Sequence, residues 1–161
     1  MTPEDKQIVK NTWEKVLPIQ ETAASLFYGR LFEQYPEVKP MFKGDMQQQG
    51  EKLMKMLDQA VGALDNIDSL IDPLKQAGKA HKEYGVQAAD YDKVGASLLW
   101  TLEQGLGEAY TSDVNDAWLR TYSTLSAVMI DGAEYMPETN ALPAGKKSWL
   151  KSLLPNAFAR P

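Results

Sequence analysis

The stretch Gln76-Ala77-Gly78-Lys79-Ala80-His81-Lys82-Glu83-Tyr84-Gly85-Val86 contains the only histidine among 161 residues. The chain has no cysteine, so His81 is its one strong soft donor for a metal ion. Leu70, Leu74, Ala77 and His81 follow one another at steps of four, three and four, which places them on one face of a helix. A lone histidine in such a stripe is most often a structural residue, so its role depends on what the rest of the chain places around it.

The composition is that of a single folded domain. Apolar residues make up 43% of the chain, which at this length is enough for a sizeable core. The formal net charge of -5 argues against a surface for nucleic acid or for anionic membranes. The absence of cysteine excludes disulfides, thiol nucleophiles and zinc–thiolate clusters. The charged N-terminus is unlike a secretory signal, and no stretch is apolar enough to cross a membrane, so we expect a cytoplasmic protein.

Helical periodicity runs through most of the sequence. Thr2-Pro3-Glu4-Asp5 predicts a helix start, because a capping hydroxyl, a proline at the first position and acids in the first turn are all favoured there. No segment alternates with a period of two, so the predicted fold class is all-α, with about seven to eight helices. The first expected helix ends at about Leu17, and the next covers residues 19–34. A long helix is expected from Met46 to about Leu64, and the helix after it ends at Tyr84-Gly85. Two more are expected, one over residues 90–107 and one from a cap at Thr111-Ser112-Asp113 to near Met136.

Two interruptions are expected within this helical frame. Val38 to Phe42 is predicted to form a short helical turn after Tyr35-Pro36-Glu37. Asp65-Asn66-Ile67-Asp68 and Asp72-Pro73 are predicted to interrupt the chain between the helix from Met46 and the helix that carries His81. Each break would turn the chain without adding a strand.

The C-terminal part of the sequence differs from the rest. Proline and glycine recur through residues 137–161, although Lys146 to Leu154 has the pattern of a short basic amphipathic helix. We therefore expect a domain over residues 1–136 and an extension over residues 137–161. A cap on the body or a partly mobile tail is expected more than membrane contact.

The order of these features resembles that of a globin, over about Pro3 to Tyr135. Four segments carry the resemblance: Tyr35-Pro36-Glu37 through Met41-Phe42 is similar to the family's corner, Gln49-Gly50-Glu51-Lys52-Leu53 to its distal helix, Gly78 through Val86 to its proximal stretch, and Tyr91-Asp92-Lys93-Val94-Gly95 to the start of the following helix. The chain looks most like bacterial single-domain haemoglobins and the globin domain of flavohaemoglobins. Those proteins pair a distal tyrosine and glutamine as Tyr28 and Gln49 do here.

The resemblance implies a globin fold around haem b, iron protoporphyrin IX, with His81 as the iron ligand. A neutral imidazole in an apolar wall supplies one axial donor and leaves the opposite side open for a gas. Tyr28 and Gln49 are expected to donate hydrogen bonds to dioxygen on that side. Two alternatives stay open: Tyr28 is a core tyrosine bonded to a backbone carbonyl, or Gln47 or Gln48 takes the place of Gln49.

Further residues are expected around the haem. Phe42 would stack on the porphyrin and Leu53 would restrict access to the iron, with ordinary packing as the alternative for both. Lys52 would pair with a haem propionate, although exposed lysines usually have no specific partner. The remaining cofactor contacts are expected from Leu74, Ala77, Tyr84, Val86, Tyr91 and Val94.

One position departs from the flavohaemoglobin pattern. In those proteins a tyrosine at the place of Tyr91 joins a carboxylate to polarise the proximal imidazole. Here the carboxylate position falls on Ala133, and the neighbouring Glu134 is expected to point elsewhere. This leaves Tyr91 or a backbone carbonyl to orient the ring of His81.

The resemblance therefore implies a globin that binds dioxygen reversibly at ferrous iron and converts nitric oxide to nitrate with an external reductase. Other small haem ligands would also bind, a peroxidase-like side activity is the alternative enzymatic expectation, and the protein would be a monomer or weak homodimer. The alternatives are oxygen storage or transport, gas sensing through the C-terminal segment, and a helical bundle without haem. With one histidine, the ferric sixth ligand is expected to be water or hydroxide, with Tyr28, Gln49 or Met56 as alternatives.

Overall fold

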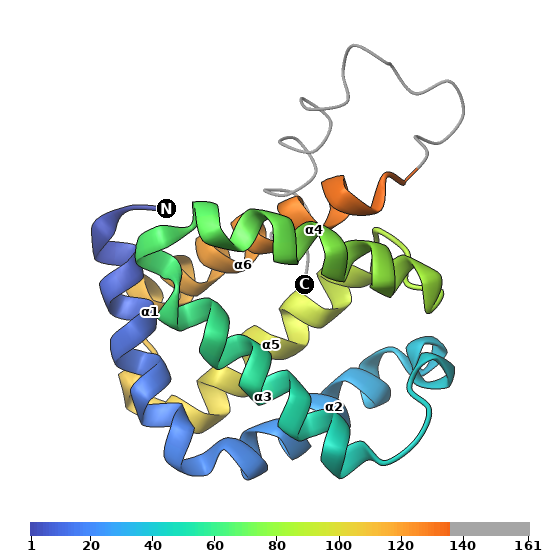
Figure 1. The fold of residues 1–161 in the computed structure, drawn as a ribbon. Coiled ribbons are helices and arrows are strands. Elements are labelled where there is room, and N and C mark those ends of the chain that lie inside the picture. The colour runs from blue at the N-terminus through green and yellow to red at the C-terminus, as the bar shows by residue number, and fades with distance from the viewer. Residues whose placement is uncertain (136–161) are drawn as a thin grey trace.

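Six α-helices, linked by loops and short 3-10 segments, form the part of the chain that the computed structural model describes, residues 1–135 (Figure 1). The α-helices are α1 (Pro3–Val16), α2 (Gln20–Gln34), α3 (Met46–Gly62), α4 (Asp68–Glu83), α5 (Asp90–Leu106) and α6 (Ser112–Ala133). The 3-10 segments are Leu17–Ile19, Pro36–Met41, Leu64–Asn66 and Gly107–Ala109. No strand occurs within residues 1–135, so the all-α class is confirmed.

The number of α-helices is slightly below the expected seven to eight. The corner before Phe42 forms a 3-10 segment instead of an α-helix, with Pro36 at its start and Pro40 inside it. Prolines lack the N–H that a continuing α-helix needs. The extension predicted over residues 137–161, with its segment Lys146 to Leu154, lies outside the described residues.

Side-chain caps begin the helices where the sequence predicts them. The hydroxyl of Thr2 accepts the N–H of Asp5 at 3.1 Å, and the Asp5 carboxylate accepts the N–H of Thr2 at 3.0 Å, which completes a capping box. Thr111 caps α6 in the same way by accepting the N–H of Val114. The start of α1 and the start of α6 are therefore as expected.

The helix that carries His81 differs from the prediction at Asp72-Pro73. α4 continues unbroken from Asp68 to Glu83 with Pro73 inside it, so the expected interruption is wrong. Pro73 removes only the hydrogen bond to the carbonyl of Ser69, early in the helix, and the packing of α4 on α6 offsets that loss. α4 ends at Glu83 with Tyr84 as its C-cap, and Gly85 follows with a φ of 98°, a conformation that favours glycine.

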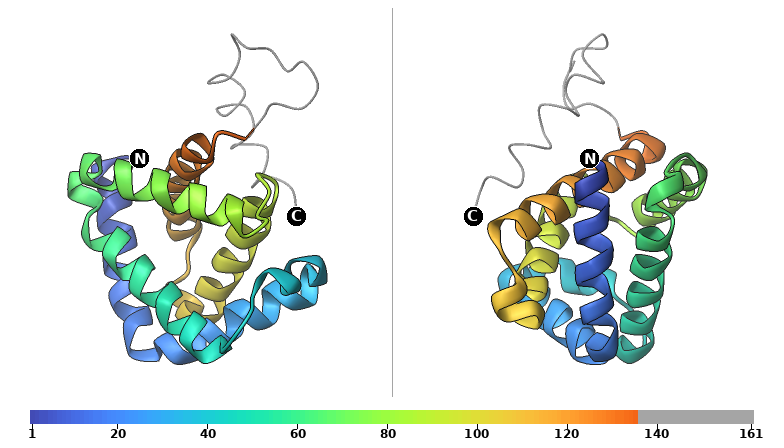
Figure 2. Two further views of the ribbon diagram at one scale, coloured as in Figure 1. Left: turned by 45° about the vertical axis from the view of Figure 1, so that its right-hand side comes forward. Right: turned by 90° about the vertical axis from the view of Figure 1, so that its left-hand side faces the viewer.

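The core lies where α1, α2, α5 and α6 meet, and α1 lies against α6 (Figure 2). Trp13 and Trp118 pack with ring centroids 6.0 Å apart, and the indole N–H of Trp118 donates to the hydroxyl of Thr12 at 2.8 Å. Arg120 on α6 donates two hydrogen bonds of 2.9 Å to the buried carboxylate of Asp5. These bonds hold the pKa of Asp5 well below its usual range.

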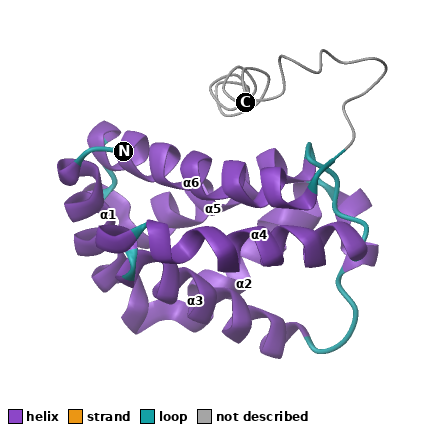
Figure 3. Cartoon of the chain, turned by 45° about the horizontal axis from the view of Figure 1, so that its top comes forward, coloured by secondary structure: helices purple, strands orange, loops and turns teal. Residues whose placement is uncertain are grey.

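The two helices that carry Gln49 and His81 are α3 and α4. α4 lies alongside α6 (Figure 3), whereas α3 packs chiefly on α2 and α1. α3 and α4 are not among the helix pairs with extended contact. Within residues 1–135, none of the helices has the length and apolar character needed to cross a membrane.

Candidate functional site

Tyr28 and Gln49 are brought together from two different helices. Tyr28 lies on α2 with 7% of its surface exposed, and Gln49 lies half-buried in the first turn of α3. The side-chain amide of Gln49 donates to the Tyr28 hydroxyl at 3.2 Å. Gln47 and Gln48, the two competing glutamines, are both exposed. The partner of Tyr28 is thus a side-chain amide and not the backbone carbonyl considered as an alternative.

The state of the Tyr28 hydroxyl follows from these surroundings. Burial raises the pKa of Tyr28 above its usual value, and the bond from Gln49 lowers it by a smaller amount. The phenol is therefore protonated at neutral pH. Because its oxygen accepts the bond from Gln49, its own proton is left to donate to another group.

A close crossing of α2 and α3 fixes this pair. A Cβ atom built on Gly50 would lie 2.9 Å from the Cβ of Ala24, closer than side chains normally approach. Gly50 directly follows Gln49, and Ala24 lies one helical turn before Tyr28. The absence of a side chain at Gly50 lets the two helices come near enough for the hydrogen bond.

Phe42 belongs to an aromatic cluster around Tyr28. The ring of Phe42 lies edge-on to that of Tyr28, with 5.4 Å between centroids, and 5.3 Å from that of Phe32. Phe42 is partly exposed. Such edge-on pairs hold the rings in fixed orientations.

His81 lies on α4 and is partly exposed. Its Nδ1 lies 2.6 Å from the backbone carbonyl oxygen of Ala77. Because a carbonyl oxygen can only accept, Nδ1 carries the proton of this bond, which leaves Nε2 as the nitrogen available to a metal. A neutral imidazole held in this way through its second nitrogen suits a metal ligand.

Tyr91 lies beside His81, with 6.4 Å between ring centroids. Its hydroxyl is buried and has no hydrogen-bond partner among the described residues. Burial raises the pKa of Tyr91 far above its usual value, so the phenol is protonated. A buried hydroxyl without a partner is costly, which fits a site that a further group completes.

Ala133 and Glu134, the two residues considered for the carboxylate position, lie at the end of α6. Ala133 is buried, and Glu134 is exposed with a φ of 53°. The backbone carbonyls of both residues accept hydrogen bonds from the Lys82 ammonium, at 3.2 and 3.3 Å. The orienting partner found for His81 is therefore the carbonyl of Ala77.

Other residues predicted around the cofactor divide into two groups. Tyr84 is 67% exposed at the end of α4, and Lys52 is exposed on α3, so the structure places both at the surface. Met56, an alternative sixth ligand, is also exposed, at 48%. The apolar residues of the second group are only partly buried, as expected for surface that a flat apolar cofactor would cover: Phe42, Leu53, Leu74, Ala77, Val86 and Val94. The residues present thus fit a haem.

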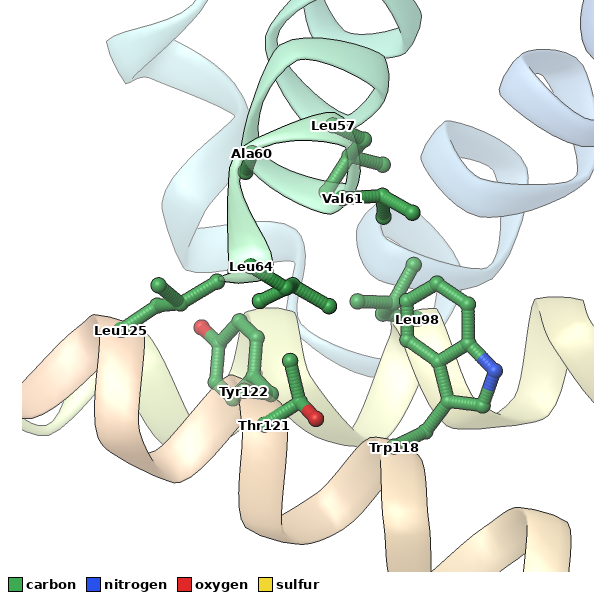
Figure 4. Close-up of a pocket in the computed structure, with 9 residues that line it drawn as sticks. All are labelled: Leu57, Ala60, Val61, Leu64, Leu98, Trp118, Thr121, Tyr122 and Leu125. Atoms are coloured by element: carbon green, nitrogen blue, oxygen red, sulfur yellow. The ribbon is translucent and has the colours of Figure 1, made fainter. Parts of the chain in front are cut away.

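A small apolar cavity lies elsewhere, between the end of α3, α5 and α6 (Figure 4). Its volume is about 20 Å³, close to the space that one water molecule needs. None of the predicted site residues contributes to it, and a sequence pattern gives no sign of it because its lining comes from separate helices. The lining residues are Leu57, Ala60, Val61, Leu64, Leu98, Trp118, Thr121, Tyr122 and Leu125.

Comparison with known proteins decides the family. The model of the Globin family matches residues 25–129. The chain belongs to the globin family. This globin is 32% identical over 146 residues to a neuroglobin of Chaenocephalus aceratus, an alignment that covers 82% of this chain and 92% of the neuroglobin.

The globin also resembles part of bacterial flavohemoproteins, as the distal pair suggests. It is 28% identical over 149 residues to a flavohemoprotein of Halalkalibacterium halodurans, which covers 90% of this chain but 36% of that protein. Among solved structures, a hexacoordinated heme protein from an anhydrobiotic tardigrade has a TM-score of 0.76 at 23% identity, covering 84% of this chain and 96% of that one. The globin fold and haem as the cofactor are thereby confirmed, and the neuroglobins are relatives that the residue pattern did not indicate.

Proposed function

We propose that this globin binds dioxygen reversibly, with His81 as the ligand to iron on one side and with Tyr28 and Gln49 facing the gas on the other. The observation that supports the proposal most is the hydrogen bond of 3.2 Å from Gln49 to the Tyr28 hydroxyl. When bound, haem supplies the ferrous iron at which a diatomic gas is held. Other small haem ligands would enter the same place.

The distal pair provides two donors for a ligand that gains negative charge. Gln49 uses one amide hydrogen on Tyr28 and keeps a second, while the Tyr28 hydroxyl keeps its own proton. Each donor would stabilise a partly anionic ligand by roughly 1–3 kcal/mol in a site shielded from water. The expected result is slow release of dioxygen.

On the opposite side, the neutral imidazole of His81 is held by the Ala77 carbonyl. A carbonyl partner adds less electron density to the ring than a carboxylate would, since it carries no full charge. Ala133 at the carboxylate position supports the same conclusion. We therefore infer a moderately donating proximal ligand, which suits the reversible holding of dioxygen.

Nitric oxide dioxygenation is the reaction we propose for this site. The net reaction would combine nitric oxide and dioxygen into nitrate; the one electron that this requires would come from ferrous haem, and a separate reductase would replace it. The likeness to the globin part of flavohemoproteins supports this reaction. Oxygen storage or transport is the second candidate, because the likeness is not limited to flavohemoproteins and extends along 92% of a neuroglobin.

One experiment separates the two candidates. Purified ferrous protein, supplied with dioxygen, nitric oxide and a flavin reductase, is expected to consume nitric oxide over repeated turnovers and to produce nitrate. The matched control is the same mixture with the His81→Ala protein. Binding of dioxygen without turnover faster than in that control would leave storage or transport as the function.

The sixth ligand of the resting ferric state is a separate proposal. This chain has one histidine, so a second imidazole cannot be the ligand. Met56 lies at the surface, and we propose water or hydroxide, hydrogen-bonded to Tyr28. A ferric spectrum that is insensitive to both pH and Tyr28→Phe would contradict this proposal.

Two further proposals concern the whole chain. We propose that the globin domain ends near residue 136 and that the protein is a cytoplasmic monomer or weak homodimer. If the extension instead carries a gas signal, truncation after residue 136 is expected to change ligand rates or the oligomeric state. Sedimentation of the protein with and without residues 137–161 gives the oligomeric state. Carbon monoxide binding rates of the same two proteins show whether the extension affects the haem site.

A further inference from the structure

α4 and α6 touch through their backbones at two glycines. A Cβ atom on Gly78 would overlap the carbonyl oxygen of Met129 and lie 2.7 Å from its carbonyl carbon. A Cβ atom on Gly132 would lie 2.7 Å from the carbonyl oxygen of Lys75. The obstructing atoms include backbone in both cases, so neither neighbour can move aside alone. The two helices therefore meet here without a side chain between them.

The contact at Gly78 is directly connected to the group that orients His81. The peptide unit between Ala77 and Gly78 is planar and rigid, and it contains both the Ala77 carbonyl oxygen and the Cα of Gly78. That carbonyl oxygen lies 2.6 Å from Nδ1 of His81. Because Gly78 is in backbone contact with Met129, the position of the Ala77 carbonyl is fixed. The hydrogen bond to that carbonyl then fixes the orientation of the His81 imidazole.

Two more contacts hold the other end of α4 to the end of α6. The Lys82 ammonium donates to the carbonyls of Ala133 and Glu134, and the Tyr135 hydroxyl donates to the carbonyl of Val86 at 2.5 Å. His81 thus lies between the glycine contact on one side and these bonds on the other. Its backbone cannot shift along α6 without breaking one of them.

We propose that Gly78 is a positioning residue for the proximal side of this globin: its backbone contact with Met129 sets the orientation of His81 toward the iron. The inference rests on the proposed role of His81 as the iron ligand. Gly78 itself touches neither the gas nor the reacting atoms. Alanine at this position would force α4 away from α6 and displace the Ala77 carbonyl.

The test compares Gly78→Ala with Gly29→Ala in the haem-loaded protein. Gly29 also lies inside a helix, but its added Cβ would meet nothing within 4 Å, so both variants gain the same helix propensity. Gly78→Ala is expected to shift the iron–histidine stretching band of the ferrous protein and to speed haem transfer to an acceptor globin by about 10- to 100-fold. Gly29→Ala is expected to change neither quantity.

A second pair of variants decides the question if Gly78→Ala does not fold. Lys82→Met removes the bonds to the end of α6 without adding bulk, and Lys79→Met removes an exposed lysine from the same helix. Lys82→Met loosens the same docking of α4 on α6 that holds Gly78 against Met129, so it is expected to shift the iron–histidine band from the wild-type position, whereas Lys79→Met is expected to leave the band unchanged. An unshifted band in Lys82→Met would then overturn the inference.

An untethered ligand shows whether the effect passes through His81. In His81→Gly protein with added imidazole, the ligand has no link to α4, so adding Gly78→Ala is expected to leave the iron–imidazole band unshifted. An equal shift with free imidazole would overturn the inference, as would unchanged bands and haem transfer rates in folded Gly78→Ala. Neither result affects the proposed function. That function instead fails if the wild-type protein takes up no haem, or if the His81→Ala variant keeps the Soret band.

Discussion

Gln49 donates a hydrogen bond of 3.2 Å to the hydroxyl of Tyr28 across the crossing of α3 and α2. The bond uses the acceptor capacity of the phenol and leaves its proton free. The two residues therefore act as one unit, in which the amide fixes the direction of the hydroxyl. A substitution of either residue is therefore expected to alter the hydrogen bonding of the other.

The first prediction concerns the pKa of Tyr28. Burial raises this pKa and the Gln49 amide lowers it, because a donor stabilises the phenolate. Gln49→Leu is therefore expected to raise the pKa of Tyr28 further, whereas Gln48→Leu, at an exposed neighbour, leaves it unchanged. Carbon-13 NMR of ring-labelled tyrosine in the ferrous carbon monoxide form measures the value. A lower pKa in Gln49→Leu would show that the amide does not bond the phenol.

The second prediction concerns the crossing of α2 and α3. Gly50→Ala places a Cβ 2.9 Å from that of Ala24 and is expected to lower the free energy of unfolding by about 1–3 kcal/mol through overpacking. Gly62→Ala in the same helix meets nothing within 4 Å and serves as the control. Urea unfolding measures both. Equal stability of the two variants would mean that the helices do not meet at Gly50.

The third prediction concerns acid stability. Arg120 holds the pKa of Asp5 well below its usual range, so this pair stabilises the fold above the ordinary carboxyl pKa and loses that effect as pH falls toward the lowered value. Arg120→Met is expected to lower the free energy of unfolding by roughly 1–3 kcal/mol at neutral pH and by less in acid. Urea unfolding at neutral pH and near pH 3 tests the trend, and a constant difference would contradict it.

Much of the frame could be predicted because its signals are local. The hydroxyls of Thr2 and Thr111 mark helix starts through bonds to residues three positions away, and both caps are confirmed. Gln49 stands four residues before Leu53, on the same helical face, and the structure exposes Gln47 and Gln48. Such short-range patterns are visible in a single sequence.

The rest depended on contacts between distant parts of the chain. Pro73 appeared to end a helix, yet α4 continues through it because α6 supports that helix from the other end of the sequence. Gly78 and Gly132 look like ordinary helical glycines until their backbone neighbours are known. The unpaired hydroxyl of Tyr91 is equally invisible in the sequence, since only the packed structure shows which polar groups lack partners.

The dissociation rate of dioxygen from the ferrous protein tests the central claim most directly. If Tyr28 and Gln49 donate to the bound gas, Tyr28→Phe and Gln49→Leu are expected to release dioxygen roughly 10- to 100-fold faster than wild type, and Gln48→Leu at the wild-type rate. Stopped-flow displacement of dioxygen by carbon monoxide gives these rates. Wild-type rates in both Tyr28→Phe and Gln49→Leu would contradict the assignment of this pair to the gas-binding side.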